Sequence, residues 1–160
     1  MEETNQFYTN KLRVRVCGIC MQGNSILLVC HRGLIDGKDF WAPPGGGLVF
    51  GESVREGLKR EFTEETGLEI RSGRFLFFNE FLRPPLHALE LFFEVQPIGG
   101  NLMIGTDPDL PADNQLITDV KYLTFQELQK IPLNQKHSIF HELVNFDDIF
   151  IPHHRFLNES

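Results

Sequence analysis

The sequence predicts an α/β fold in a single domain, with helices packed on a mixed sheet. Two observations predict it: several segments alternate between apolar and polar residues, and a capped amphipathic helix interrupts them near residue 60. The early segments form hairpins, which favours a mixed sheet over a doubly wound parallel one. With 160 residues, 41% of them hydrophobic, the chain can bury one core of ordinary size. We expect one domain over residues 1–160, with its core at about 11–147 and a tail at 148–160.

The first two strands are expected at residues 11–21 and 25–31, joined as a hairpin by the turn at 22–24. In the first strand Leu12, Val14 and Val16 alternate with charged residues, which predicts one wet face. The second strand is more continuously apolar and should be more buried. The remaining apolar segments predict further strands near 70–81, 87–95 and 117–123, with a long loop over about 96–116.

The longest helix is expected over about residues 53–66. Ser53 and Glu56 have the spacing of a capping box, and Gly67 ends the helix in the C′ position. Apolar residues at i, i+4 and i+8 should face the sheet; they are Val54, Leu58 and Phe62.

Two shorter helices are expected further along the chain. The same capping signal, Thr124 followed by Glu127, predicts a short helix over 124–130. A last helix is expected over about 135–146.

The charge and composition exclude several classes of function. The formal net charge of −7 and the pI near 5.3 argue against a generic nucleic-acid or anionic-membrane binder. No apolar run approaches the ~20 residues that span a bilayer, and the N-terminus is acidic. Three cysteines, an odd number, argue against a disulfide scaffold. Cys17 and Cys20 form a CxxC, but within a strand they would point to opposite faces. We expect a cytoplasmic protein.

Three glutamates of the long helix carry the strongest chemical signal. Glu61, Glu64 and Glu65 stand at i, i+3 and i+4, so their carboxylates project together at the edge of the apolar stripe. A divalent cation would relieve their repulsion, and oxygen ligands suit Mg²⁺ or Mn²⁺ better than zinc. The alternative is a solvated acidic face without a ligand.

A spacing pattern across residues 46–68 favours the metal-site interpretation. The specified positions are Gly46, Glu52, Arg60, Glu61, the apolar Phe62, Glu64, Glu65, Gly67 and the apolar Leu68. This pattern resembles the Nudix box of the Nudix hydrolases, with no departure at any specified position. The resemblance implies an α/β/α sandwich around a mixed sheet. It also implies a hydrolase that cleaves the diphosphate linkage of a nucleoside diphosphate derivative through attack of water on phosphorus, with Mg²⁺ or Mn²⁺ as cofactor.

The resemblance also implies roles for particular residues. Glu61, Glu64 and Glu65 would bind the metal, with Glu52 as an accessory ligand, and Arg60 would hold a helix carboxylate in place. Catalysis would rest on Glu61, Glu64 and Arg60, with Glu61 as the general base inside the box. Bases outside the box remain open; the candidates are Glu80, Glu90, Glu94, Asp109 and Asp113. Glu90 and Glu94 alternate with apolar neighbours, which also fits side chains facing solvent.

Substrate contacts are expected from the glycine-rich segment and from two arginines. Gly45, Gly46 and Gly47 would let the backbone approach the helix and the phosphates closely. Arg32 ends the second strand beside this segment, although a residue at a strand end is also typical of a surface turn. Arg83 lies in a rigid, proline-containing hairpin loop from which it could meet the substrate. The aromatic residues near the box, Trp41, Phe40, Phe50 and Phe81, are expected mainly in the core.

The group attached to the nucleoside diphosphate stays open between a nucleoside triphosphate, a sugar nucleotide such as ADP-ribose, and a dinucleotide. The loops at 32–41, 82–88 and 96–116 should set this choice. The alternative function is a non-catalytic Nudix-fold domain that senses a nucleotide, but every box carboxylate is present here. The resemblance further implies a homodimer, because many family members pair.

Overall fold

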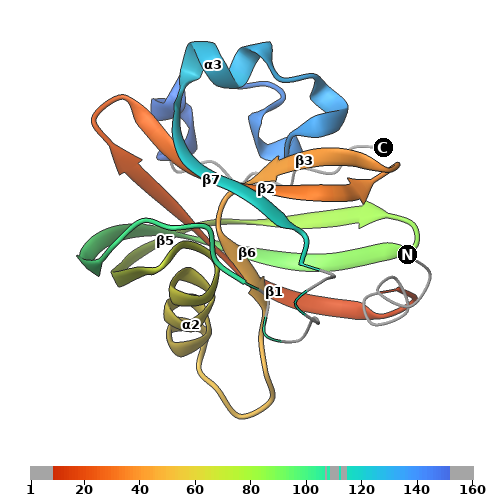
Figure 1. Ribbon diagram of the computed structural model, residues 1–160, viewed down its shortest axis with the longest axis vertical. Coiled ribbons are helices and arrows are strands. Elements are labelled where there is room, and N and C mark those ends of the chain that lie inside the picture. The colour runs from red at the N-terminus through yellow and green to blue at the C-terminus, as the bar shows by residue number, and fades with distance from the viewer. Residues whose placement is uncertain (1–8, 107, 109–111, 113–114, 152–160) are drawn as a thin grey trace.

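The computed structural model describes residues 9–106, 108, 112 and 115–151 (Figure 1). Its longer elements, in chain order, are β1 (Leu12–Gln22), β2 (Ser25–Ile35), β3 (Lys38–Ala42), β4 (Gly45–Gly47), α2 (Val54–Thr66), β5 (Leu68–Arg83), β6 (Leu86–Gly100), β7 (Ile117–Thr124) and α3 (Phe125–Lys130). Short 3-10 turns follow at Leu133–Gln135, Ser138–Phe140 and Phe146–Ile149. No described helix has the length and apolar character needed to cross a membrane.

Strand β1 lies at the centre of the fold and connects its two parts. It pairs in parallel with β6 from Leu12 to Cys20, and antiparallel with β4 on its other edge. The expected hairpin with β2 is confirmed but covers only the turn-proximal residues of β1, because β2 then leaves to pair with β3 and β7. Strands β5 and β6 form the longest hairpin. The sheet is therefore mixed, as expected.

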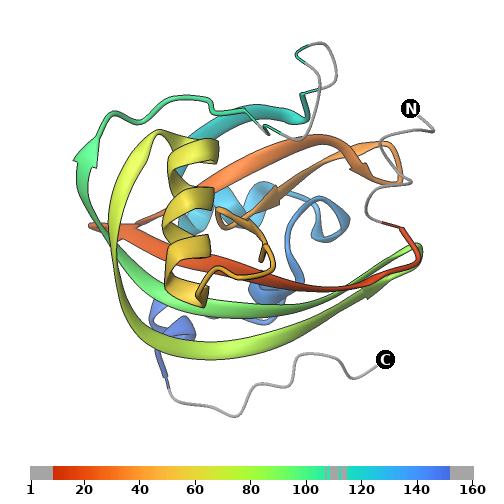
Figure 2. The ribbon, with the colours of Figure 1, turned by 90° about the horizontal axis from the view of Figure 1, so that it is seen from below.

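The two helices cover opposite sides of this sheet. Helix α2 lies across β1, β5 and β6, and α3 lies on the far side near β7 (Figures 1 and 2). The expected α/β/α arrangement is confirmed. It follows from the two apolar faces of the sheet, since each face needs a covering layer to bury it.

Helix α2 forms for the local reasons that the sequence indicates. Ser53 accepts from the backbone N–H of Glu56, and the Glu56 side chain accepts from the backbone N–H of Ser53, which completes the capping box. Gly67 ends the helix in the left-handed conformation, with φ at 72°. Leu58 and Phe62 are fully buried against the sheet. The position of α2 is thus fixed by its caps and its apolar face.

The core divides into a cluster under α2 and a larger cluster under α3. Cys20 belongs to the first and Cys17 to the second, so the two thiols do lie on opposite faces of β1. Burial raises the pKa of the thiols of Cys17, Cys20 and Cys30. The CxxC spacing is therefore a consequence of strand packing and not a joint site.

The prediction that the charged residues of β1 form its solvent-exposed face is wrong for the first half of the strand. Leu12 and Val14 are 62% and 43% exposed, Arg13 and Arg15 are half-buried, and all four residues line a cavity. This end of β1 borders an open cavity, so its apolar side chains are not covered by packed residues. Alternation alone gives two faces but does not tell which one is covered.

The helix expected over 135–146 is also wrong, because tertiary contacts hold its first residues extended. The backbone N–H of His137 donates to the Trp41 carbonyl at 2.9 Å, and the Lys136 ammonium donates to the Leu128 carbonyl at 3.0 Å. Only short 3-10 turns follow. The packed region also extends past residue 147, since Ile149 is buried.

Other corrections concern the glycine-rich segment and the long loop. Residues 32–51 contain β3 and β4, and β6 extends to Gly100, so the loop expected from residue 96 begins later. Phe50, expected in the core, is fully exposed. Phe40 is buried, in agreement with expectation.

Candidate functional site

A cavity of about 650 Å³ lies between the strands and α2. Acidic side chains of α2 and the backbone of β4 form part of its wall. Another part is apolar, formed by side chains that include Leu34, Phe40, Phe81, Leu86 and Ala88. A cavity of this size and mixed lining is typical of a small-molecule site.

Arg60 organises the acidic part of the cavity. Its Nε and Nη2 donate to the two carboxylate oxygens of Glu52 at 3.0 and 2.7 Å. Its Nη1 donates to Glu61 at 2.8 Å and to Glu64 at 3.1 Å, and Nη2 also reaches the Gly47 carbonyl at 3.0 Å. Hydrogen bonding to Glu52 is the main cause that raises the pKa of Arg60, which therefore stays charged.

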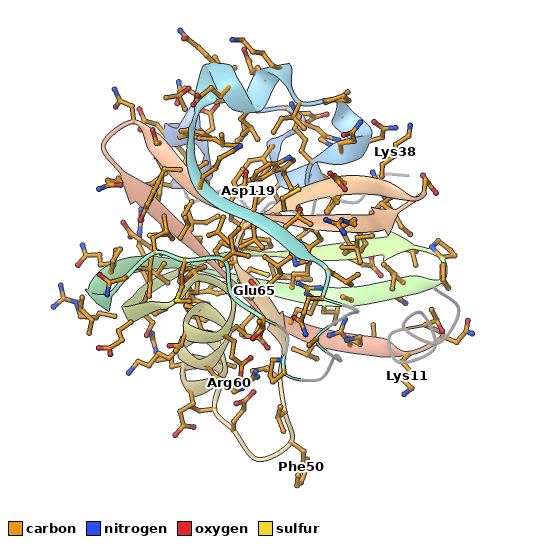
Figure 3. The ribbon with its side chains drawn as sticks, in the orientation of Figure 1. Lys11, Lys38, Phe50, Arg60, Glu65 and Asp119 are labelled. Carbon is orange, nitrogen blue, oxygen red and sulfur yellow. The ribbon has the colours of Figure 1, made fainter. Side chains whose placement is uncertain are left out.

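Glu65 lies deeper, where α2 meets β4. Its Oε2 accepts from the backbone N–H of Gly45 at 2.8 Å, and its Oε1 lies 3.5 Å from Nε2 of His31. Figure 3 shows Glu65 near the middle of the molecule and Phe50 at the tip of the loop that leads into α2. Glu65 is buried, so the end of α2 brings a carboxylate into the wall of the cavity.

The glycine-rich strand β4 allows this close approach. A Cβ added at Gly46 would overlap the Glu61 carboxylate, and one at Gly45 would overlap the Val16 carbonyl. Gly45 also has a φ of 156°, close to extended backbone. The glycines therefore allow β4 to lie against the carboxylates, while contact with phosphates stays a prediction.

The electrostatics of Glu61 reflect crowding of like charges. Burial and the neighbouring Glu65 raise its pKa to about 7, although the hydrogen bond from Arg60 lowers it. Around Arg60 and β4, the carboxylates of Glu52, Glu61 and Glu64 face the Arg60 guanidinium, and Glu65 accepts from Gly45. Arg15 is a second positive charge that interacts with Glu61 and Glu65. The cluster therefore has an excess of negative charge that a cation would neutralise.

The donor set fits a hard divalent cation, since all four side chains offer carboxylate oxygens. Within the described residues no group of three or more His, Cys, Asp or Glu side chains is already gathered around one point. The reason is visible in the geometry: Arg60 draws Glu52, Glu61 and Glu64 toward its own nitrogens. In both Glu61 and Glu64 the contact with Arg60 uses one of the two carboxylate oxygens.

A buried polar network in the cavity wall was missed by the sequence interpretation. Glu90, a candidate base for which a solvent-facing side chain was the alternative, is 3% exposed. Its Oε2 lies 2.7 Å from Nε2 of His137 and accepts from the Asn79 amide at 3.0 Å. Arg15 lies 3.7 Å from Glu90 Oε1 and donates to the Gly45 carbonyl at 3.0 Å. No local pattern signals this network, because it depends on the pairing of β1 with β6.

The two arginines expected to contact substrate lie at the margins of the site. Arg32 is exposed and lies outside the cavity lining, with its backbone N–H donating to the Leu116 carbonyl. The guanidinium of Arg83 lies 6.0 and 5.9 Å from the ring centroids of Phe40 and Phe81. Arg83 thus borders two residues of the apolar wall.

The remaining candidate bases are dispersed. Glu80 lies 2.9 Å from Nε2 of His87, which lines the cavity. Glu94 is paired with Arg74 at 3.1 Å and does not line the cavity. Asp109 and Asp113 lie outside the described residues. Among the candidates, the structure therefore brings Glu61 and Glu90 into the cavity wall.

Comparison with known proteins identifies the family. A model of the NUDIX domain matches residues 10–144. The chain is 31% identical to the nucleoside triphosphatase NudI of Enterobacter sp. over 132 residues, which cover 77% of this chain and 89% of that protein. It is 35% identical to an ADP-ribose pyrophosphatase of Methanocaldococcus jannaschii over 96 residues, or 59% of this chain. That match spans only 56% of the archaeal protein.

Solved structures agree on the fold. A MutT Nudix hydrolase from Burkholderia pseudomallei has a TM-score of 0.62 at 18% identity and covers 77% of this chain and 88% of its own. A UDP-X diphosphatase has a TM-score of 0.59 at 22% identity and covers 84% of this chain and 64% of its own. The chain therefore belongs to the Nudix family, whose domain covers most of it.

Proposed function

We propose that this protein is a metal-dependent pyrophosphohydrolase that cleaves the diphosphate linkage of a nucleoside diphosphate derivative by attack of water on phosphorus. One observation carries the proposal: Arg60 gathers Glu52, Glu61 and Glu64 beside Glu65 in the wall of a 650 Å³ cavity. Similarity to an ADP-ribose pyrophosphatase, a nucleoside triphosphatase and the fold of a UDP-X diphosphatase supports the substrate class.

Glu61, Glu64 and Glu65 would hold the cofactor, with Glu52 as an accessory ligand. The oxygen-only donors favour Mg²⁺, with Mn²⁺ as the alternative. When bound, such an ion lowers the pKa of coordinated water and neutralises charge on phosphate oxygens. The chain is acidic overall, so this positive charge also makes an anionic substrate acceptable.

The protein residues supply positioning and proton transfer. Arg60 holds Glu52 and Glu61 in a fixed relation, and the backbone N–H of Gly45 orients Glu65. Glu61 lines the cavity and accepts a hydrogen bond from Arg60, so its carboxylate is suited to accept a proton from the attacking water. Glu61 is therefore our choice of general base.

The decisive experiment is a phosphate-release screen with Mg²⁺ over nucleoside triphosphates, sugar nucleotides, ADP-ribose and dinucleotides. Glu64→Gln and Glu65→Gln should abolish turnover and leave the protein folded. Glu69→Gln, an exposed carboxylate just beyond the helix, is the matched control and should keep full activity. Full turnover in a folded Glu64→Gln, Glu65→Gln double variant would overturn the metal-site assignment.

If no compound of the screen releases phosphate but the same compounds still raise the melting temperature, the result would instead favour a nucleotide sensor. The presence of all four box carboxylates in the cavity wall favours the hydrolase. By family resemblance we also expect a cytoplasmic homodimer. Light scattering tests the dimer, and a monomer would remove that expectation without affecting the chemistry.

A further inference from the structure

Arg15 and Glu90 face each other across the wall of the cavity without completing a hydrogen bond. They are register partners on the parallel strands β1 and β6, and both line the cavity. Arg15 Nε lies 3.7 Å from Glu90 Oε1, too far for a hydrogen bond. Within the described residues, Arg15 Nε is buried and has no hydrogen-bond acceptor. A buried donor without a partner costs free energy, so a ligand that satisfies it is favoured.

Both groups are held in place by other contacts. The second oxygen of Glu90 is engaged by Asn79 at 3.0 Å and by His137 at 2.7 Å, and all three side chains are buried. Arg15 is fixed through Nη2, which donates to the Gly45 carbonyl at 3.0 Å. The Nε donor and the Oε1 acceptor are therefore preorganised, and the gap between them is a property of the fold.

The donor on one side of this gap and the acceptor on the other determine which chemical groups can bind there. A group placed there must accept a hydrogen bond from Nε and donate one to the carboxylate Oε1. A hydroxyl does both. A phosphate oxygen would be repelled by the Glu90 carboxylate, and an amino group cannot accept from Arg15. The gap therefore fits a hydroxyl group, or a water molecule that a hydroxyl displaces.

The gap lies between the acidic cluster and the apolar wall. On one side Arg15 donates a hydrogen bond to the Gly45 carbonyl, and the backbone N–H of Gly45 donates to the Glu65 carboxylate. On the other side the His137 ring lies 6.2 and 5.6 Å from the rings of Phe40 and Phe81. The acidic cluster, the gap between Arg15 and Glu90, and the apolar wall thus follow one another in the order of phosphate, sugar and base along a nucleotide.

We propose that Arg15 and Glu90 are specificity-determining residues that bind a ribose hydroxyl, so that the cavity holds the nucleoside half of the substrate with its base against Phe40 and Phe81. The inference rests on the proposed function for the position of the diphosphate. It adds that the enzyme selects ribonucleosides by a hydroxyl.

The test measures binding without relying on turnover. The four ribonucleoside 5′-monophosphates contain no diphosphate linkage, and calorimetry gives the dissociation constant for each. The 2′-deoxy and 3′-deoxy forms of the tightest binder are then compared with it. We expect one deoxy form to bind about 10- to 100-fold more weakly, the range for a hydrogen bond to a charged group. In Glu90→Gln that difference should fall below about 3-fold, because the amide oxygen would turn toward Asn79 and His137 and leave an uncharged NH₂ donor on the Arg15 side.

Two further variants keep the result interpretable. Arg15→Lys removes the Nε donor and should also reduce the discrimination, which covers the case in which Glu90→Gln does not fold. Glu94→Gln, on the same strand but paired with Arg74 outside the cavity, is the matched control and should keep the wild-type ratio.

Equal binding of all three sugar forms by the wild type would show that the gap holds only water and would overturn the inference. Failure of all four monophosphates to bind would also overturn it, as would unchanged discrimination in folded Glu90→Gln. Discrimination without hydrolysis of any diphosphate would leave this inference standing and overturn the proposed function instead.

Discussion

Arg60 and Glu52 form a two-pronged ion pair, in which Nε and Nη2 donate to the two carboxylate oxygens at 3.0 and 2.7 Å. The backbone N–H of Val49 also donates to Glu52 Oε1 at 2.8 Å, the oxygen that accepts from Arg60 Nη2. The pair therefore ties the loop before α2 to the middle of the helix. It also leaves Arg60 Nη1 aimed at Glu61 and Glu64, whose positions depend on it.

Arg60→Lys should lower kcat/KM by about 10- to 100-fold with the fold intact, since residues that hydrogen-bond to metal ligands and orient them have effects of this size. An ammonium is a point charge and cannot reproduce the planar fork that binds Glu52 while reaching Glu61. The Mg²⁺ concentration for half-maximal activity should rise. Activity measured over a Mg²⁺ titration checks both effects.

Arg55→Lys is the matched control for this variant. Arg55 lies on the same helix but binds Ser72 and Gly73 away from the cavity. It should change the Mg²⁺ requirement little. If Arg55→Lys and Arg60→Lys shifted the requirement equally, Arg60 would have no special role in positioning the carboxylates.

Gly46→Ala should reduce activity much more than stability. The added Cβ would overlap the Glu61 carboxylate, which is the end of a side chain and can move away. Moving it removes a metal ligand from its place. Gly99→Ala is the control, because its Cβ would lie 3.0 Å from the Glu69 carboxylate, outside the site. Comparable losses of kcat/KM in the two variants would contradict the prediction.

The Glu90 network should stabilise the folded protein above pH 4.5, and this stabilisation should be lost at acidic pH. Burial alone would raise the pKa of Glu90, but His137, Arg15 and Asn79 together lower it from the ordinary 4.5 of a glutamate to about 2. A lowered pKa in the folded state means stability that is present above 4.5 and is lost as the pH falls toward 2. The contribution is on the order of 3 kcal/mol.

Urea unfolding between pH 2 and 5 checks this prediction. The wild type should gain free energy of unfolding across this interval more steeply than Glu90→Gln does. The exposed-surface control Glu94→Gln should follow the wild type. Parallel curves for the wild type and Glu90→Gln would mean that Glu90 has an ordinary pKa in the folded protein.

Local signals were sufficient to predict α2 and its carboxylates. The capping box of Ser53 and Glu56, the terminating Gly67 and the stripe of Leu58 and Phe62 all lie within one short segment, and the structure shows each of them. The capping box at Thr124 and Glu127 is confirmed for the same reason. Such features depend on neighbours a few residues apart, which the sequence displays directly.

Features that depend on distant strands could not be predicted in this way. Glu90 is buried because β6 pairs with β1 and brings Arg15 beside it, and because His137 arrives from beyond α3. The segment at 135–146 is not helical since His137 is bonded to the Trp41 carbonyl. In both cases a long-range contact overrides the local pattern, and no window of sequence contains the two partners.

Glu61 should make the metal-free protein less stable as the pH rises toward neutrality. Burial and the charge of Glu65 raise its pKa from the ordinary 4.5 of a glutamate to about 7. A carboxyl whose pKa is raised by folding contributes stability that is fully present below 4.5 and is lost as the pH rises through 7. The expected loss is on the order of 3 kcal/mol. This window lies above that of Glu90, so the two residues act in separate pH ranges.

Urea unfolding in a chelator between pH 4.5 and 7.5 checks this expectation. The wild type should lose free energy of unfolding over this range, and Glu61→Gln, which cannot ionise, should lose much less. Glu69→Gln, exposed beyond the helix, should behave as the wild type. Added Mg²⁺ should flatten the wild-type curve, because a cation favours the ionised carboxylate. An identical slope in the wild type and Glu61→Gln would show that the crowding around Glu61 does not oppose its ionisation.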